Sequence, residues 1–384
     1  MSCEEKHPEE RKMIVMDIKI DNFFAFKNFH MNMAYPKKIV DSYIENEYLE
    51  ERPNFRYKKV NILMGANATG KTSFGRMLMA IFNFMVKKQY EKLTDNICDE
   101  SKMASCSVDF VVHKCKLYRV NIKIKPKSGR AYQNSDIDVQ IRMVNINKKD
   151  SYEMCVERIE KLKEQKCSNY IEELEKIQGL SWMFEYPSDF YGNQRHYTPR
   201  NTDKYLDILN RTLKALDPLI EKVEKIEGID DTYAICMKDK IIVMQEGKVI
   251  DKDILSSGTR AGIEVAGVLT AMIEGECGFY YCDEKFSFIH SDIEKAFLAV
   301  MIQCMKEEDQ LFFTTHNTDI LDLPLPKHTF TFLRKDCRNK TQPIQNICAS
   351  DYLKRNTDSL RNAVENDLFL AGPAVELIYE IAEL

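Results

Sequence analysis

The chain has 384 residues, of which 44% are hydrophobic and 30% charged, and this composition excludes a disordered tail protein. Its length allows two or three domains or one large elaborated domain. The longest apolar run, Ala296 to Ile302, is much shorter than the roughly 20 residues that cross a bilayer, which excludes a transmembrane protein. The net charge of −5 does not favour a nucleic-acid binder, although a local basic surface is compatible with it.

The N-terminus and the cysteines both indicate a cytoplasmic protein. Residues 1–11 are charged and lack the apolar segment of a secretory signal. The 12 cysteines include no Cys-x-x-Cys pair, which favours reduced thiols and leaves a structural zinc site as the weaker alternative.

The N-terminal part of the chain alternates between strand and helix patterns. Apolar residues at every second position predict two strands within 13–34, and an apolar run predicts a buried strand at 60–64. The polar stretch 41–57 is interpreted as an insertion between the strands within 13–34 and the strand at 60–64. Helical spacing of apolar residues follows Thr72, and alternation returns over 104–146, which predicts further strands.

The rest of the chain predicts more helices, a hairpin and then a regular alternation. Helical spacing occurs over 150–178 and 206–226, and 233–250 has the pattern of a β-hairpin that turns near Glu246 and Gly247. The expected elements after it are a helix over 259–274, a strand over 278–283, a helix over 291–306, strands over 310–315 and 329–334, and two C-terminal helices. This alternation predicts an α/β core.

A glycine-containing loop stands between the predicted strand at 60–64 and the following helix. The run from Gly65 to Thr72 reads GANATGKT and fits the phosphate-binding pattern GxxxxGK[ST] without a mismatch. In this pattern Gly65 and Gly70 allow backbone N–H groups to surround a phosphate chain. Lys71 contacts the β- and γ-phosphates, and Thr72 offers its hydroxyl to Mg²⁺.

Two carboxylates stand at the end of the predicted strand at 278–283. In the run FYYCDE, Asp283 is suited to hold Mg²⁺ and Glu284 to orient and deprotonate the attacking water. Such a pair is common after strands, and a solvated strand end is the alternative. The phosphate-binding loop elsewhere in the chain makes the catalytic interpretation the stronger one.

Two further signals are weak by themselves. The run LSSGTR at 255–260 opens a predicted helix with small residues, as an anion site does, but an ordinary helix cap is the alternative. The run TTHN at 314–317 places His316 at the end of a predicted strand, where a lone histidine is usually structural.

The order and spacing of these four signals resemble the ABC-type ATPase heads of the SMC proteins and their relatives. Gly258 precedes Asp283 by 25 residues, and Asp283 precedes His316 by 33. The resemblance extends from the strands near Ile18 to the helix near Glu365. It implies an α/β P-loop NTPase fold of the ABC-ATPase head type, with a mixed β-sheet core, an antiparallel β lobe and a helical insertion.

The resemblance implies a single ABC-type ATPase domain over residues 1–384. Its N-terminal lobe at 13–148 carries the Walker A loop, a helical insertion covers about 150–228, and the C-terminal lobe at 229–384 carries the signature, the Walker B strand and the switch histidine.

Each matching residue receives a role from the resemblance. ATP and Mg²⁺ are the implied cofactors. Lys71, Glu284 and His316 are implied in catalysis, and Thr72 and Asp283 at the metal. The residues implied to bind the nucleotide are Gly65, Asn67, Gly70, Lys71, Thr72, Ser73, Ser257 and Gly258. In this family the signature reaches the γ-phosphate bound to the opposite subunit, which implies a homodimer or a higher homo-oligomer.

Other family positions match less closely. Residues 289–292, IHSD, stand where the D-loop is expected but depart from the Leu-His-Pro of related proteins. Gln194 is a candidate for the Q-loop, with a polar surface loop as the alternative. Phe24 and Phe26 are candidates for a contact with adenine, and packing in the core is the favoured alternative.

Within this group the chain resembles the OLD-like AAA branch of ATP-binding proteins, which is common in bacterial anti-phage systems. The matching segments are SSGT at 256–259, ALDPLI at 215–220 and SLRN at 359–362. Relatives with a C-terminal Toprim nuclease continue beyond the point where this sequence stops, so no nuclease is expected within it.

These features predict an ATPase that hydrolyses ATP slowly, dimerises around it, and controls a separately encoded effector as a sensor or scaffold in anti-phage defence. The alternative is a nucleic-acid-binding ATPase of the DNA-repair or end-processing type, suggested by the fold, by basic residues within 123–130, and by Arg195 and Arg200. Solvated loop charges also explain these basic residues, and the net charge favours that explanation. No membrane partner is expected.

Overall fold

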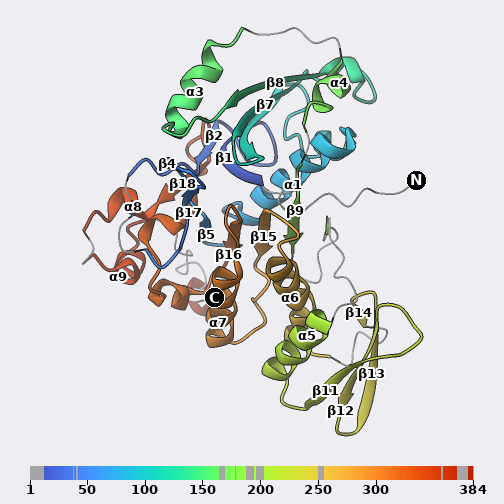
Figure 1. Ribbon diagram of the computed structural model, residues 1–384. Helices are drawn as coiled ribbons and strands as arrows, with labels where there is room; N and C mark the ends of the chain where they lie inside the picture. The colour runs from blue at the N-terminus through green and yellow to red at the C-terminus, as the bar shows by residue number, and fades with distance from the viewer. Residues whose placement is uncertain are drawn as a thin grey trace.

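The computed structural model describes residues 13–37, 39, 42–163, 169–177, 179–186, 194–195, 203–249, 255–355, 358–369 and 379–383. Their strands form sheets of seven, five, four and two strands. The seven-stranded sheet lies in the middle of the molecule, with the five-stranded sheet above it and the four-stranded sheet below it in the view of Figure 1.

The central sheet is mostly parallel. Its order is β10 (Gln194–Arg195), β9 (Trp182–Glu185), β15 (Phe279–Asp283), β16 (Gln310–Thr314), β5 (Val60–Met64), β17 (Phe330–Lys335) and β18 (Ile344–Cys348), with only the two edge strands antiparallel to their neighbours. Strands β5, β15 and β16 are buried along their whole length, as expected of parallel strands covered on both faces.

The upper sheet is antiparallel and packs over helix α1 (Lys71–Lys87). Its strands are, in spatial order, β2 (Phe29–Asn32), β1 (Met13–Asp21), β6 (Ala104–Val112), β7 (Lys116–Ile124) and β8 (Ile137–Asn145). Phe74 of α1 belongs to one buried cluster with Phe110 of this sheet and Phe312 of the central sheet. Helix α1, which follows the phosphate-binding loop, is therefore held between two sheets.

Helices cover the other face of the central sheet and connect it to the lower sheet. The long ones are α5 (Asp203–Leu216), α6 (Ser257–Glu274) and α7 (Ser291–Cys304). A second buried cluster joins α6 and α7 to the central sheet, and a third joins α5 and α6 to the lower sheet. The lower sheet consists of β11 (Ile220–Lys225), β12 (Thr232–Met237), β13 (Lys240–Gln245) and β14 (Lys248–Val249).

Shorter elements complete the described part of the chain. They are β3 (Tyr48–Leu49), β4 (Arg52–Arg56), α2 (Glu91–Thr94), α3 (Tyr152–Lys161), α4 (Tyr170–Leu174), α8 (Ala349–Tyr352), α9 (Leu360–Glu365) and 3₁₀ turns that include η3 (Thr318–Asp322). The pair β3 and β4 forms the two-stranded sheet within the stretch expected as a polar insertion.

The structure corrects the helix expected over 206–226. Helix α5 ends at Leu216, and β11 begins at Ile220. Pro218 explains the break because it lacks an amide N–H and restricts the residue before it. The Asp217 carboxylate also accepts from the N–H of Leu219 at 3.0 Å and so closes a turn there.

Two other expectations also need correction. The main hairpin turn within 233–250 lies between Met237 and Lys240, and the turn at Glu246 and Gly247 instead joins β13 to β14. Both turn residues have positive φ, which suits a two-residue loop between antiparallel strands. The insertion expected as helical over 150–228 is helical only in part, because it also contains β9 of the central sheet and the edge strands β10 and β11.

Within the described residues, no helix is long and apolar enough to span a membrane. The ten cysteines that the structure describes are free. Among the same residues, no group of three or more His, Cys, Asp and Glu side chains is arranged to hold a metal ion, so the structure offers no support there for a zinc site.

Candidate functional site

The central sheet brings three of the four sequence signals to one edge. Strands β15, β16 and β5 are parallel neighbours, with Asp283 opposite Thr314 and Thr314 opposite Leu63. The segments that follow these strands are the acidic pair, the loop of His316 and the phosphate-binding loop. Because the carboxyl ends of neighbouring parallel strands meet, these segments converge although they are up to about 250 residues apart in sequence.

The phosphate-binding loop has a backbone that its glycines make possible. Gly65 and Gly70 have φ values of 146° and 105°, which residues with a side chain rarely adopt. A Cβ atom on Gly65 would lie 2.4 Å from the carbonyl oxygen of Leu333. Helix α1 begins at Lys71 with no side-chain cap and no acidic residue in its first turn, so its N-terminal amides are left for an anion.

Lys71 is buried at the centre of this edge. Its Nζ donates to the carbonyl oxygens of Gly65 at 2.8 Å and Ala66 at 3.2 Å, and it lies 3.4 Å from Oε1 of Glu284. Burial lowers the pKa of Lys71, while the charges of Glu284 and Asp283 act in the opposite direction. This ammonium group is placed to contact phosphates that the loop would surround.

Glu284 and His316 form the second contact of the cluster. His316 Nε2 lies 2.9 Å from Glu284 Oε2, and His316 Nδ1 lies 3.4 Å from Lys71 Nζ. A neutral imidazole with its proton on Nε2 satisfies both contacts. Burial tends to raise the pKa of Glu284, but the hydrogen bond from His316 and the charge of Lys71 outweigh it and lower that pKa. Glu284 is therefore a carboxylate at neutral pH, as a general base must be.

Asp283 has the environment of a metal ligand. Its carboxylate is fully buried, and Oδ1 accepts from Thr314 Oγ1 at 2.7 Å. Oδ2 is buried without a hydrogen-bond partner among the described residues. Burial raises the pKa of Asp283 to about 6, although the hydroxyls of Thr72 and Thr314 lower it in part. An unpartnered carboxylate oxygen near a threonine hydroxyl offers the oxygen ligands that Mg²⁺ prefers.

Two residues without a role in the sequence-based interpretation support this cluster. Thr314 bonds Asp283 through its hydroxyl and also accepts from the Glu284 N–H, at 2.9 Å, so it holds both carboxylate residues in place. Tyr281 donates from its hydroxyl to the carbonyl oxygen of Lys71 at 2.9 Å. The TTHN run contained the signal for Thr314, but nothing local to Tyr281 distinguished it from a core residue.

The signature candidate stands at the start of helix α6, whereas the phosphate-binding loop stands at the start of α1. Ser256 caps α6, where its hydroxyl accepts from the Thr259 N–H at 3.0 Å, and Ser257 is the first residue of the helix. A Cβ atom on Gly258 would lie 3.0 Å from the carbonyl oxygen of Phe288, just before the D-loop candidate. The signature and the D-loop candidate are thus neighbours.

A cleft of about 850 Å³ opens beside the phosphate-binding loop. It is lined by Met64, Gly65, Ala66, Asn67, His316, Thr318, Phe332, Val364, Glu365, Asp367 and Phe369. Asn67 is exposed at its edge, and Ser73 is half-buried in the first turn of α1. The cleft therefore gives access to the loop and the histidine from outside.

The remaining candidates have distinct positions. Phe26 is fully buried and packs against Phe29 and Phe74, in agreement with the favoured role in the core. Phe24 is only partly buried, and the Arg76 guanidinium lies 5.2 Å from the centre of its ring. Gln194 lies at the sheet edge in β10, and its role as the Q-loop residue stays a prediction.

Comparison with known proteins gives structural matches only. No protein-family model and no curated protein matches this chain. A structure of the SmcHead bound to the C-winged helix domain of ScpA matches with a TM-score of 0.50 and 12% identity, over 89% of this chain and 99% of that one.

A second match is the Smc head domain with an extended coiled coil, bound to the C-terminal domain of ScpA derived from Pyrococcus furiosus. It has a TM-score of 0.50 and 10% identity, over 94% of this chain and 100% of that one. The chain therefore has the mixed α/β fold of an SMC head, and the expected fold class is confirmed.

Proposed function

We propose that this chain is an ABC-type ATPase that binds ATP with Mg²⁺ and hydrolyses it slowly. The observation that carries the proposal is the convergence of Lys71, Glu284 and His316, with 2.9 Å and 3.4 Å contacts, at the edge where the phosphate-binding loop begins α1. A loop for phosphates, a buried cation and a carboxylate held by a histidine are the parts that phosphoryl transfer to water requires.

Different residues of the chain bind the phosphates, hold the metal and accept the proton. The loop amides and Lys71 bind the phosphates, Thr72 and Asp283 would hold the metal, and Glu284 accepts a proton from the attacking water. Bound Mg²⁺ supplies positive charge to the β- and γ-phosphate oxygens. His316 holds Glu284 in orientation through its 2.9 Å contact.

We further propose that two copies close around ATP, with Ser257 of one copy facing the nucleotide of the other. The phosphate-binding loop starts α1 and the signature starts α6, and these two helices pack on opposite faces of the central sheet. In a two-fold symmetric pair, each nucleotide would then be covered by the partner's signature.

Replacing Ser257 with arginine tests this dimer. Ser257→Arg is expected to keep ATP affinity within about twofold of wild type and to lose the ATP-dependent dimer, because the larger side chain and its charge enter the shared interface. Sedimentation velocity with ATP and Mg²⁺ measures the dimer. Gln303→Arg, which adds the same charge on the exposed side of α7, is the control. A wild-type dimer in Ser257→Arg would contradict the assignment.

The purpose proposed for the ATPase is to hold or release a separately encoded effector protein, in the manner of an OLD-like ATPase of anti-phage defence. The cleft beside His316 offers surface that ATP-driven closure would rearrange. The two Smc head structures each hold a domain of a different protein, ScpA, which supports a head of this fold acting with a partner.

Purification of tagged Glu284→Gln with ATP and Mg²⁺, from cells that carry the neighbouring genes, tests this purpose. Native mass spectrometry is expected to show a homodimer or higher homo-oligomer together with a second protein. A bare homo-oligomer would contradict the scaffold role and leave only the ATP-dependent assembly. A complex that nuclease treatment disperses, without a second protein, would favour the alternative function in DNA repair or end processing.

The basic turn gives this alternative limited support. Lys127 pairs with Glu100 at 2.8 Å, and Lys125 donates to the carbonyl oxygen of Ser135 at 2.7 Å, so both cations have partners within the chain. Lys123 and Arg130 are exposed and are the residues of this turn that a phosphate backbone would meet. Arg200 lies outside the described residues.

A further inference from the structure

His316 stands in a three-residue loop whose two other members bond the same carboxylate. The loop, residues 315–317, joins β16 to η3. Thr315 Oγ1 donates to Glu294 Oε1 at 2.6 Å, and Asn317 Nδ2 donates to Glu294 Oε2 at 2.8 Å. Each oxygen of Glu294 thus accepts from one neighbour of His316, and the histidine is bracketed by the two bonds.

Glu294 is a buried carboxylate whose two oxygens accept these hydrogen bonds. It lies in the first turns of α7 and is 5% exposed. Burial raises the pKa of Glu294, and the bonds from Thr315 and Asn317 act in the opposite direction. A buried carboxylate is costly unless donors satisfy it, so the pairing of Glu294 with this particular loop is a specific feature of the fold.

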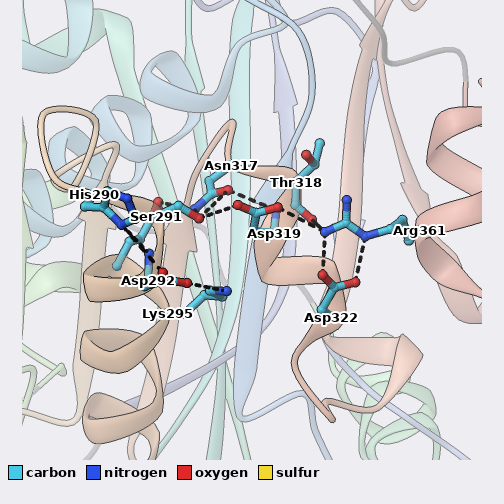
Figure 2. A network of polar contacts seen from close by, with 10 residues as sticks. His290, Ser291, Asp292, Lys295, Asn317, Thr318, Asp319, Asp322 and Arg361 are labelled. Atoms are coloured by element: carbon cyan, nitrogen blue, oxygen red, sulfur yellow. Dashed lines mark hydrogen bonds and ion pairs between the residues drawn. The ribbon is translucent and has the colours of Figure 1, made fainter.

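The same loop is attached to the start of α7 by a second set of contacts. Figure 2 shows Ser291 pointing at Asn317 and Asp319, with Arg361 of α9 beyond them. Asn317 Nδ2 donates to Ser291 Oγ at 3.1 Å, and the Ser291 hydroxyl also donates to the Asp319 carboxylate. Arg361 pairs with Asp319 at 3.1 Å. The D-loop candidate and the histidine loop are therefore one bonded unit.

The side chain of His316 contacts two candidate catalytic residues, Glu284 and Lys71. Its ring contacts Glu284 at 2.9 Å and Lys71 at 3.4 Å, yet 39% of the side chain is exposed to solvent in the cleft. Packing alone does not fix a side chain with this much exposure. The side chains of Thr315 and Asn317, the residues on either side of His316, are each held by a hydrogen bond to Glu294.

We propose that Glu294 is a positioning residue, which fixes the 315–317 loop so that His316 reaches Glu284 and Lys71. Glu294 touches neither the nucleotide loop nor the acidic pair, and it acts through the histidine. The link from Ser291 through Asn317 means that a movement of the D-loop segment moves the same loop. The catalytic consequence rests on the proposed ATPase function, whereas the positioning itself does not.

Glu294→Gln is the test variant because it keeps the size of the side chain and replaces one acceptor oxygen with an amide donor. Either Thr315 or Asn317 then loses its acceptor. Lys295→Ala is the matched control, since Lys295 is the next residue of α7 and forms its ion pair with Asp292 of the same helix, at 2.8 Å. Thermal unfolding of both variants checks that they fold.

The first readout does not require hydrolysis. Proton–nitrogen NMR of the histidine side chains, with His316 assigned by the loss of its signals in His316→Gln, reports the surroundings of the imidazole. Glu294→Gln is expected to move the His316 ring-nitrogen signals toward those of an unconstrained imidazole, while Lys295→Ala leaves them in place. Unchanged His316 signals in Glu294→Gln would overturn the proposal, even if the protein proved to have no ATPase activity.

The second readout is steady-state ATP hydrolysis. Glu294→Gln is expected to lower kcat about tenfold with KM within about twofold, and Lys295→Ala to match wild type. In a His316→Ala background, Glu294→Gln is expected to cause no further loss, because its effect passes through the histidine. A full tenfold loss in that background would overturn the proposal. Absence of hydrolysis in the wild-type protein would instead refute the proposed function, and the NMR result would still decide the role of Glu294.

Discussion

Glu284→Gln is expected to bind ATP with Mg²⁺ at near wild-type affinity and to hydrolyse it at least about 100-fold more slowly. The substitution keeps the size of the side chain and the 2.9 Å contact with His316 but removes the basic carboxylate. Glu284 has a φ of 44°, and glutamine adopts this backbone no less readily, so the fold is expected to persist. Phosphate release in the steady state measures the loss.

The same variant is expected to accumulate as an ATP-bound dimer. If hydrolysis opens the dimer, a chain that binds but does not hydrolyse ATP stays closed, and sedimentation shows it. Glu365→Gln is the matched control, because Glu365 also lines the cleft and carries the same charge, but it contacts Arg361 rather than Lys71 or His316. Hydrolysis by Glu284→Gln at the wild-type rate would show that another group is the base.

Lys71→Ala is expected to weaken ATP binding by at least about 100-fold. The ammonium group is the buried cation that faces the phosphate-binding loop, and charge-assisted hydrogen bonds to phosphate contribute about 1.5–3 kcal/mol each. Two such bonds lost correspond to a factor of about 100 or more in affinity. Titration with a fluorescent ATP analogue, or calorimetry with ATP, measures the change.

A measurement of thermal stability distinguishes a specific loss of ATP affinity in Lys71→Ala from misfolding of the variant. Lys71→Ala is expected to show a cooperative thermal unfolding transition without nucleotide, because the buried ammonium group that it removes is costly, as its lowered pKa indicates. Lys87→Ala, at the exposed C-terminal end of the same helix, is expected to leave both affinity and stability unchanged. Full ATP affinity in Lys71→Ala would exclude the proposed role of the loop.

Prediction from the sequence succeeded where the signal lies in consecutive residues. The strand at 60–64, the loop from Gly65 and the helix after Thr72 follow one another directly, so apolar patterning and glycine placement predicted them together. It failed where one residue overrides a pattern, as Pro218 does when it ends α5 and the chain continues as β11. Phe26 shows the same limit, because a phenylalanine near the loop fits either adenine or a core, and its packing against Phe74 decided for the core.

The amino-acid sequence by itself determined the α/β class, the phosphate-binding loop and the acidic strand end, because these depend on side-chain period and local backbone freedom. The ABC-ATPase head type came from a resemblance in the order and spacing of the motifs. Only the tertiary structure decided which distant residues meet. The order of β15, β16 and β5 places Asp283 beside Thr314 and brings His316 to Lys71, and no spacing in the chain specifies that order. The position of Glu294 could be interpreted only from the folded chain, because its hydrogen-bond partners, Thr315 and Asn317, come from a loop that is distant in sequence.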